Sequence, residues 1–348
     1  MDKLNITNSN VLRLYREALR LKQGEKISPW MSLIHLTERC NHNCYGGDCE
    51  YADIRSSKNI HELNRDRALL LIDEIRELGS LSILFSGGGE PMLHPAFAEV
   101  IERAQSNGLM VGIFSNGSLI EKYNLAPNIV DYATFIRVSI DAASPATFST
   151  VRGVSGSGFK KVIAGVTSLV EERTRKKKNI DIGLKFLISK MNIEEISDII
   201  ELGLKIGVDT IQFKPLRGGK NEMNQNEISR AKQLIKNAKL AHPNFIIGGT
   251  DDKRHDLIPC FLTPLRAVID GRGDVMLCNY FNHRRYTHKI GNVYHKKLTD
   301  IWFGPEHRAV LQKGIDTKGC TLYDCRFHEL NKELSYIIDN FGKTLNFV

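Results

Sequence analysis

The chain has 348 residues, of which 42% are hydrophobic and 25% are charged, and this composition allows one large globular domain or two modest ones. It excludes disordered, collagen-like and coiled-coil proteins. No apolar run approaches the roughly 18 residues of a transmembrane helix, and the N-terminal MDKLNITNSN lacks the basic-then-apolar order of a secretory signal. We therefore expect a cytoplasmic protein without a membrane partner.

The formal net charge is +8, from 48 Lys and Arg against 40 Asp and Glu. Much of the excess lies in one run, RTRKKK at residues 173–178, which follows a predicted helical stretch over residues 158–172. Cations stabilise the C-terminal end of a helix through its dipole. We interpret the run as a solvated helix end and do not expect a nucleic-acid partner.

Residues 30–245 have the pattern of successive βα units, preceded by a helical segment. Residues 9–23 place their apolar side chains mostly on one helical face, which predicts a docked N-terminal helix. Six strands are then predicted, at 32–37, 82–86, 110–115, 135–141, 180–188 and 210–215. Helices are predicted near 62–79, 95–107, 118–124, 158–175 and 193–206. The pattern indicates an α/β fold, a partial (β/α)6 TIM barrel, with functional loops where the strands end.

After about residue 245 the pattern changes to a small α+β module. Residues 265–278 predict a hairpin that turns at residues 270–273, and residues 329–339 predict a final amphipathic helix. We therefore expect an N-terminal helical extension at 1–29, the barrel at 30–245 and the hairpin-containing module at 246–348.

Seven cysteines are the informative count, because a reducing cytosol favours metal binding or catalysis over disulfides. Cys40, Cys44 and Cys49 lie together in CNHNCYGGDC directly after the first predicted strand. Three thiolates can hold a metal or an iron–sulfur cluster, and a [4Fe–4S] cluster with three protein ligands leaves one iron open. The remaining Cys260, Cys278, Cys320 and Cys325 fall in the C-terminal module. Four thiolates fully ligate a second cluster, or alternatively a zinc ion.

Three segments resemble the radical S-adenosylmethionine (radical SAM) enzymes that carry a SPASM or twitch auxiliary-cluster module. These are the cysteine loop, GGGEP at 87–91 after the second strand, and GDVMLC ending at Cys278, and the resemblance covers roughly residues 30–330. The usual motif is CxxxCxxC, whereas this chain has Gly47 where the third cysteine is expected and offers Cys49. We interpret this difference as a two-residue loop insertion made possible by Gly46 and Gly47.

The resemblance implies S-adenosylmethionine on the open iron and an auxiliary [4Fe–4S] cluster in the C-terminal module. One electron, from a donor such as flavodoxin or ferredoxin, would split the sulfonium to a 5′-deoxyadenosyl radical, which abstracts a substrate hydrogen. Tyr45 is the candidate aromatic residue for packing on adenine.

Cofactor-binding residues are expected at the strand ends. Glycines allow close backbone approach, and the carboxylate of Glu90 can accept from the methionyl amino group; the alternative is that Glu90 only begins a helix. Polar side chains after strands three and four can bind the ribose hydroxyls or the methionyl carboxylate, although a turn at Asn116 would also explain one pair. Arg152 resembles a carboxylate-binding arginine of the family, with a surface arginine as the alternative. The predicted set is Gly87, Gly88, Gly89, Glu90, Ser115, Asn116, Ser139, Asp141 and Arg152.

Substrate residues are predicted at Lys185, Lys214 and Arg217, on or after strands five and six. Alternation along the strand puts Lys185 opposite Leu184 and Phe186, but does not decide which face is inward. These cations would suit a small-molecule substrate that is anionic or rich in hydroxyl groups.

Three functions follow from these features. The first is hydrogen abstraction for oxidation, dehydration or epimerisation of a sugar, aminocyclitol or other small polar metabolite. The second is modification of a ribosomally made peptide. The third, of another class, is a noncatalytic iron–sulfur electron carrier or a zinc-stabilised binding module.

Overall fold

The computed structural model describes residues 17, 19–21, 23–47, 49, 60–216, 219–248, 260–278, 288–315 and 328–340. The described residues belong to two compact units. The first draws on Met1–Ile34, Leu70–Ile83 and Asp252–Val348, and the second on His35–Leu69 and Leu84–Asp251. Strands β1 (Met31–His35) and β2 (Ser82–Ser86) and helix α3 (Arg65–Glu77) each have residues in both. The domain boundaries at 29 and 245 stay predictions.

The second unit is built from parallel strands alternating with helices. Its strand order is β2-β3-β4-β5-β6-β7, and the pairs from β3 to β7 are all parallel. The further strands are β3 (Met110–Ser115), β4 (Phe135–Ser139), β5 (Asp181–Ile188), β6 (Thr210–Pro215) and β7 (Ile246–Gly248). The helices are α4 (Phe97–Ser106), α5 (Ala126–Tyr132), α6 (Pro145–Arg152), α7 (Ser157–Lys176), α8 (Ile196–Ile206) and α9 (Gln225–Ala241). All six predicted barrel strands are present, and the expected partial TIM barrel is confirmed.

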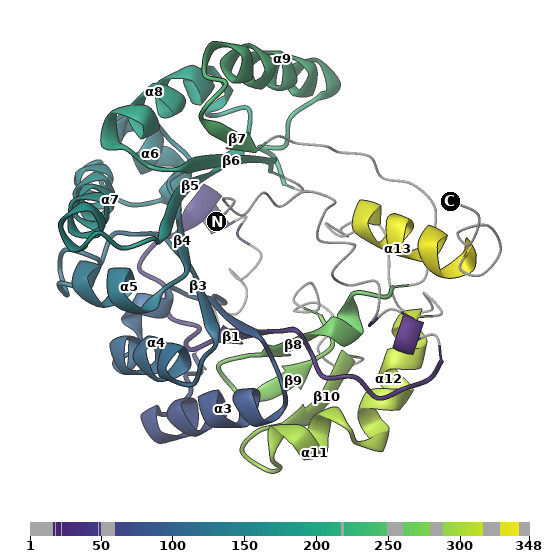
Figure 1. The fold of residues 1–348 in the computed structure, drawn as a ribbon. Coiled ribbons are helices and arrows are strands. Elements are labelled where there is room, and N and C mark those ends of the chain that lie inside the picture. The colour runs from purple at the N-terminus through teal and green to yellow at the C-terminus, as the bar shows by residue number, and fades with distance from the viewer. Residues whose placement is uncertain are drawn as a thin grey trace. The chain divides into compact units, whose positions relative to one another are not determined.

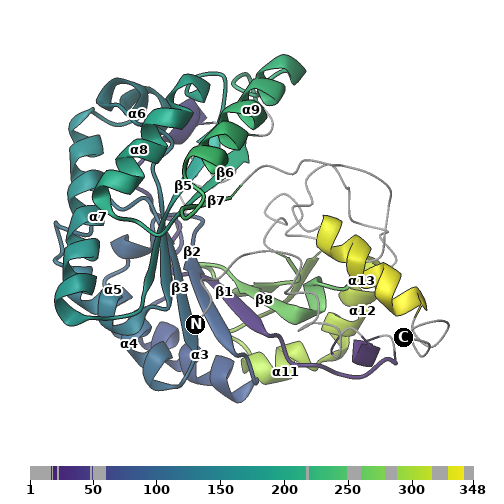
Figure 2. The ribbon, with the colours of Figure 1, turned by 45° about the horizontal axis from the view of Figure 1, so that its top comes forward.

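One face of these strands is covered by helices. Helices α4, α5, α7 and α8 lie along one side of β3–β6 in both views (Figures 1 and 2). On β5, Leu184 and Phe186 are almost completely buried, and the Phe186 ring contacts Phe213 of β6 at 5.5 Å between centroids. Lys185 and Leu187, which alternate with these two residues along the strand, are only half-buried. Because strand side chains alternate, Lys185 lies on the face that the helices leave open.

The helix predicted near 118–124 is wrong. These residues form turns, and helix α5 begins only at Ala126. Asn124 has a left-handed φ of 48°, which interrupts a helix, and Pro127 then fixes a helical φ in the first turn of α5. The helix therefore begins only after Asn124, later than predicted.

The basic run at 173–178 is held by acidic side chains. Arg173 pairs with Asp209 and also donates to the carbonyl of Gly207 at 3.0 Å. Lys176 pairs with Asp131 at 2.5 Å, and this contact lowers the pKa of the Asp131 carboxyl. Arg175 pairs with Glu172 on the same helix. These contacts agree with the interpretation of the run as a solvated helix end.

The first unit contains an antiparallel hairpin joined to β1. Its strand order is β10-β9-β8-β1, with β8 (Arg266–Ile269) parallel to β1 and antiparallel to β9 (Asp274–Met276). The predicted hairpin is confirmed; in its turn the Asp270 carboxylate accepts from the amides of Arg272 and Asp274, and Gly273 adopts a φ of 78°. The remaining elements are β10 (Lys289–Asn292), α11 (Leu298–Trp302), α12 (Pro305–Ile315) and α13 (His328–Asn340).

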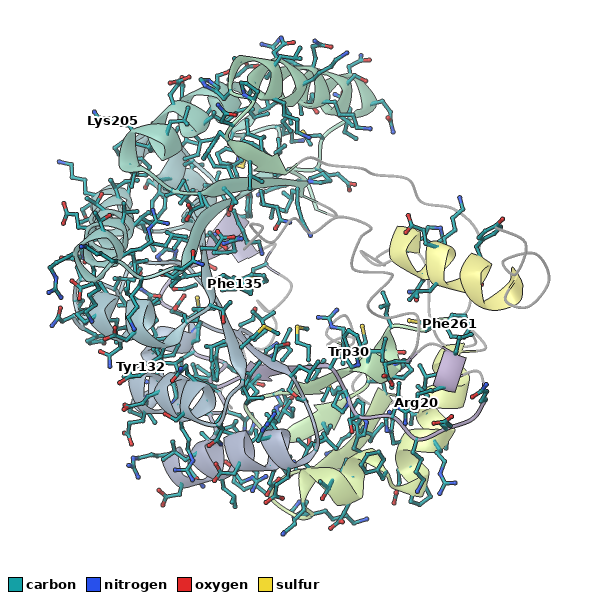
Figure 3. All side chains as sticks on the ribbon, in the orientation of Figure 1. Arg20, Trp30, Tyr132, Phe135, Lys205 and Phe261 are labelled. Carbon is teal, nitrogen blue, oxygen red and sulfur yellow. The ribbon has the colours of Figure 1, made fainter. Side chains whose placement is uncertain are left out.

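Helix α13, the predicted C-terminal helix, packs on the segment that begins at Cys260. Its Leu334 is fully buried with Ile27 and Phe261, and Trp30 and Cys260 pack against the same apolar cluster. Trp30 and Phe261 are labelled in Figure 3. Of the helix predicted at 9–23, the described residues Glu17 and Leu19–Leu21 are helical and Gln23 lies in a turn, while the others lie outside the described residues. No helix in the described part of the chain is long and apolar enough to cross a membrane.

Candidate active site

The first cysteine loop leaves β1 and enters a short 3-10 helix at Cys44–Gly47. Cys40, Cys44 and Cys49 are each partly buried. Burial raises the pKa of Cys44 to about 11; Arg152 opposes this shift, while Cys49 and Cys40 add to it by charge repulsion. Cys40 and Cys49 are therefore both close enough to Cys44 to influence the charge of its thiol.

A single metal ion and an iron–sulfur cluster require different spacings of the three thiolates. Across the described ranges, no three His, Cys, Asp or Glu side chains form a group able to hold one ion. Thiolates around a tetrahedral ion with bonds of about 2.3 Å lie about 3.8 Å apart. In a [4Fe–4S] cluster each thiolate binds a different iron, so the sulfurs must be further apart. Three thiolates in one loop are the donor number that leaves one iron of a [4Fe–4S] cluster without a protein ligand.

Two asparagines fasten this loop to the end of β3. The Asn116 side chain donates to Asn41 at 2.8 Å, and Asn41 donates to the Ser118 hydroxyl at 2.8 Å. Asn116 also accepts from the Ser118 amide, which is the expected turn. Asn41 was not singled out in the sequence, although its place between two cysteines was the available signal.

The glycines of GGGEP allow backbone segments to meet. A Cβ on Gly89 would lie 1.9 Å from the carbonyl oxygen of Arg39, the residue before Cys40. A Cβ on Gly87 would lie 1.8 Å from the Gly89 oxygen, and Gly88 is buried. The Glu90 amide donates to the same Arg39 oxygen at 2.7 Å. The glycines thus bring GGGEP directly against the cysteine loop.

Glu90 is a buried carboxylate, 2% exposed, whose oxygens accept from three donors. The Ser115 hydroxyl lies at 2.7 Å, the Asn116 amide at 2.7 Å and the Met92 amide at 3.1 Å. The Met92 contact caps the 3-10 helix Pro91–Leu93, so Glu90 also begins a helix, as the alternative interpretation expected. Burial raises the pKa of Glu90, while these donors oppose the shift.

Asp141 and Arg152 form a buried ion pair beside the cysteine loop. Arg152 donates to Asp141 at 2.7 Å and to the Ser139 carbonyl at 2.8 Å, while its own carbonyl accepts from the Asn43 amide. The other oxygen of Asp141 accepts from the Leu187 amide at 2.7 Å. Burial opposes the charge on Arg152, but Cys44 and Asp141 outweigh it and raise its pKa. Arg152 is therefore not a surface arginine.

Tyr45 is buried against the end of β5. It has a left-handed φ of 54° and donates its hydroxyl to the Leu187 carbonyl at 2.9 Å. Burial raises its pKa well above the usual range. The Leu187 carbonyl also accepts from Asn192, another residue the sequence did not reveal. The role of Tyr45 at adenine stays a prediction.

The predicted substrate lysines share the open face of the strands. Lys185 is paired in register with Ser139 of β4 and Gln212 of β6, and Lys214 lies two residues beyond Gln212. The Lys185 ammonium lies 4.2 Å from the centroid of the Phe114 ring, a cation–π contact. Arg217 lies outside the described residues.

The predicted auxiliary ligands Cys260 and Cys278 are partly buried and flank strands β8 and β9 in the first unit. Asn331 of α13 donates its side-chain amide to the Cys260 sulfur at 3.4 Å. This donor suits an anionic thiolate ligand. Cys320 and Cys325 lie outside the described residues.

Two family models match the chain. The radical SAM superfamily matches residues 34–203, and SPASM, an iron–sulfur cluster-binding domain, matches residues 260–326. The chain therefore belongs to the radical SAM superfamily and carries a C-terminal SPASM domain. Its expected cofactors, S-adenosylmethionine, a [4Fe–4S] cluster and auxiliary iron–sulfur binding, are those that these two domains imply.

Among curated proteins, the chain is similar to the AdoMet-dependent heme synthase of Methanosarcina barkeri, with 32% identity over 52% of this chain and 48% of that protein. It is 28% identical to the Fe-coproporphyrin III synthase of the same organism, over 65% of this chain and 56% of the relative. The chain thus spans about half the length of these relatives. Among solved structures, Streptococcus suis SuiB bound to S-adenosylmethionine shares the fold, with a TM-score of 0.64 and 16% identity. The match covers 89% of this chain and 72% of SuiB.

Proposed function

We propose that this protein is a radical SAM enzyme that abstracts hydrogen from a small polar metabolite. The observation that carries the proposal is Glu90, a buried carboxylate held at the end of β2 against the cysteine loop. Its two oxygens offer about four lone-pair positions, and the protein uses three. Among the described residues no cation forms an ion pair with it, so a ligand ammonium would compensate the cost of burying its charge.

Cys40, Cys44 and Cys49 would hold the [4Fe–4S] cluster, and the side chains around them would position S-adenosylmethionine. When both are bound, they supply one-electron cleavage of the sulfonium and a 5′-deoxyadenosyl radical that removes a substrate hydrogen. The contact between Glu90 and Arg39 keeps the proposed ammonium site beside the first of these cysteines. Anchoring the loop through Asn41 would limit its movement when the ligand binds.

Arg152 complements Glu90 with the opposite charge. Its Nε is buried and has no hydrogen-bond partner in the described part of the chain, although both other nitrogens donate to protein oxygens. The positive charge of Arg152 acts to lower the pKa of both Glu90 and Cys44. The pair would therefore suit a zwitterion, with its ammonium at Glu90 and its carboxylate near Arg152.

The substrate would lie over the open face of β4, β5 and β6. Lys185 and Lys214 supply positive charge there, and Ser139 and Gln212 supply hydrogen-bonding groups. This combination favours an anionic or hydroxyl-rich metabolite over an apolar one. The mass of the product separates the reaction types, because oxidation removes two hydrogens, dehydration removes water and epimerisation leaves the mass unchanged.

Anaerobic reconstitution tests the class of reaction. With reductant and S-adenosylmethionine, the wild-type protein should release 5′-deoxyadenosine, and Cys44→Ala should release none. The wild type should bind about eight iron and Cys44→Ala about four. Equal release by the two proteins would refute the proposal, and the absence of both S-adenosylmethionine binding and release in the wild type would favour the electron carrier. Tight binding of a precursor peptide would favour peptide modification.

Lysine variants test the substrate surface. Lys185→Met or Lys214→Met should raise the KM for an anionic substrate about 10- to 100-fold, because a hydrogen bond to a charged group contributes about 1.5–3 kcal/mol. Lys205→Met is the matched control, since Lys205 is exposed on α8 on the helix-covered side (Figure 3). An unchanged KM in both test variants would contradict the assignment.

A further inference from the structure

Asn331 is a buried polar side chain of α13 that the proposed radical chemistry does not use. It is only 2% exposed, and both ends of its amide are engaged. The oxygen accepts from the Phe261 amide at 3.0 Å, and the nitrogen donates to the Cys260 sulfur at 3.4 Å. Because the oxygen is fixed by a backbone donor, the NH2 group must face the sulfur, which determines the orientation of the amide.

The surroundings of Cys260 make this hydrogen bond important. Cys260 packs against the apolar cluster that includes Phe261, Leu334 and Trp30. An anionic sulfur in such surroundings lacks water on that side, and its charge is stabilised only by groups that the protein supplies. Hydrogen bonds to sulfur and solvent exposure are two of the factors that set the reduction potential of an iron–sulfur cluster.

We propose that Asn331 is a positioning residue that raises the reduction potential of the auxiliary cluster through its N–H to the Cys260 sulfur. The inference rests on the proposed function, in which Cys260 is a ligand of that cluster. Reduction adds negative charge to an already anionic group, so an N–H donor stabilises the reduced form more than the oxidised form. An auxiliary cluster of higher potential is a better electron acceptor.

The same hydrogen bonds also fix α13 to the start of the SPASM domain, so packing and electrostatics must be separated. Asn331→Leu removes the donor and keeps a side chain of similar size. Asn331→Asp keeps an oxygen for the Phe261 amide and presents a second oxygen, without a proton, to the sulfur. Leu334→Val is the matched control, because Leu334 lies one turn along the same helix, is fully buried and donates no hydrogen bond. It loosens the packing of α13 but leaves the donor in place.

The experiment measures the midpoint potential of the auxiliary cluster by EPR-monitored redox titration of the full chain. All variants carry Cys44→Ala, which removes the first cluster from the spectrum. About four iron per chain in this background shows that the auxiliary cluster is present. Its absence there would refute the auxiliary site itself and with it the inference, whereas the test of 5′-deoxyadenosine release by the wild type would be unaffected.

The expected result is a shift to more negative potential in Asn331→Leu and a larger shift in Asn331→Asp, with no shift in Leu334→Val. Loss of the cluster in the Asn331 variants, with full iron content in Leu334→Val, would also support a role of Asn331 in holding the Cys260 sulfur. Equal potentials in Asn331→Leu and its parent, or equal effects of Asn331→Leu and Leu334→Val, would overturn the inference.

Discussion

Replacing Asp141 with asparagine tests whether its carboxylate stabilises the second unit or binds the cofactor. Both carboxylate oxygens are already occupied, one by Arg152 and one by the Leu187 amide. We therefore expect the main effect on stability. Asparagine has the same size and tolerates the left-handed φ of 56° at this position, so the substitution removes charge with little backbone strain.

The expected loss in the free energy of unfolding follows from the burial of the ion pair, because Asp141 is 3% exposed and Arg152 is 6% exposed. Two unit charges about 4 Å apart attract by about 4 kcal/mol at an effective dielectric constant of about 20. Removing one partner of a buried pair leaves the other charge uncompensated and costs about 3–5 kcal/mol. That is a large share of the roughly 5–15 kcal/mol that stabilises a typical domain.

Urea unfolding of the apoprotein measures this loss. The two tryptophans, Trp30 and Trp302, both belong to the first unit, so their fluorescence follows that unit, while far-UV circular dichroism also follows the helices of the second. Asp131→Asn is the matched control, because its side chain is 32% exposed and its pair with Lys176 should contribute only about 0–1 kcal/mol. An equal loss in Asp141→Asn and the control would refute the reasoning. Unchanged stability with weaker S-adenosylmethionine binding would favour a cofactor role.

Three further substitutions address the ligand site, a buried histidine and a close backbone contact. Glu90→Gln should weaken S-adenosylmethionine binding about 10- to 100-fold in equilibrium titrations, because it removes the charge that would bind the ammonium. Burial lowers the pKa of His307, whose Nδ1 donates to the Trp302 carbonyl, so protons favour the unfolded chain. The urea concentration at the midpoint of unfolding, followed by tryptophan fluorescence, should therefore decrease as the pH is lowered below about 6.5. The decrease should be smaller in His307→Asn. Gly89→Ala should lower the iron content and the thermal midpoint, because its Cβ would lie 1.9 Å from the Arg39 oxygen.

Each of these predictions has a control within the chain. Glu74→Gln neutralises another buried carboxylate, in α3, and should leave S-adenosylmethionine affinity unchanged. His242→Asn removes a more exposed histidine paired with Glu201 and should keep the wild-type pH slope of tryptophan fluorescence. Gly108→Ala changes a glycine with a φ of 77° but no neighbour within 4 Å of the added Cβ, and should retain its iron. A control as strongly affected as its test variant would contradict the corresponding prediction.

The strands were predictable because they combine local apolar runs with turn residues. The six barrel strands and the hairpin at Asp270 needed no information beyond their own segments. Helix α5 was misplaced because its start depends on Asn124 and Pro127 rather than on apolar spacing. The sequence of β5 alone could not show which face of the sheet carries Lys185, because the answer depends on which face the helices cover.

Side chains that join distant segments were not predictable in the same way. Asn41 reaches Asn116 across 75 residues of sequence, and Asn331 reaches Cys260 across 71. Both are common polar residues, and only Asn41 had a sequence signal, its place between two cysteines. Their roles come from hydrogen bonds that form only when the chain has folded, so a motif search finds the cysteines and misses the residues that orient them.

The two buried arginines of the second unit show why geometry is needed to separate structural from functional charge. Arg137 donates from two nitrogens to the two carboxylate oxygens of Asp181, at 2.9 and 2.8 Å, and so forms a bidentate ion pair within the protein. Arg152 divides its donors between Asp141 and the Ser139 carbonyl, and its buried Nε has no partner in the described part of the chain. Both arginines are equally buried and both have an aspartate, so burial and charge alone do not distinguish them. The uncommitted donor of Arg152 supports the proposed contact with a ligand carboxylate, because a buried N–H without an acceptor is costly unless a ligand supplies one.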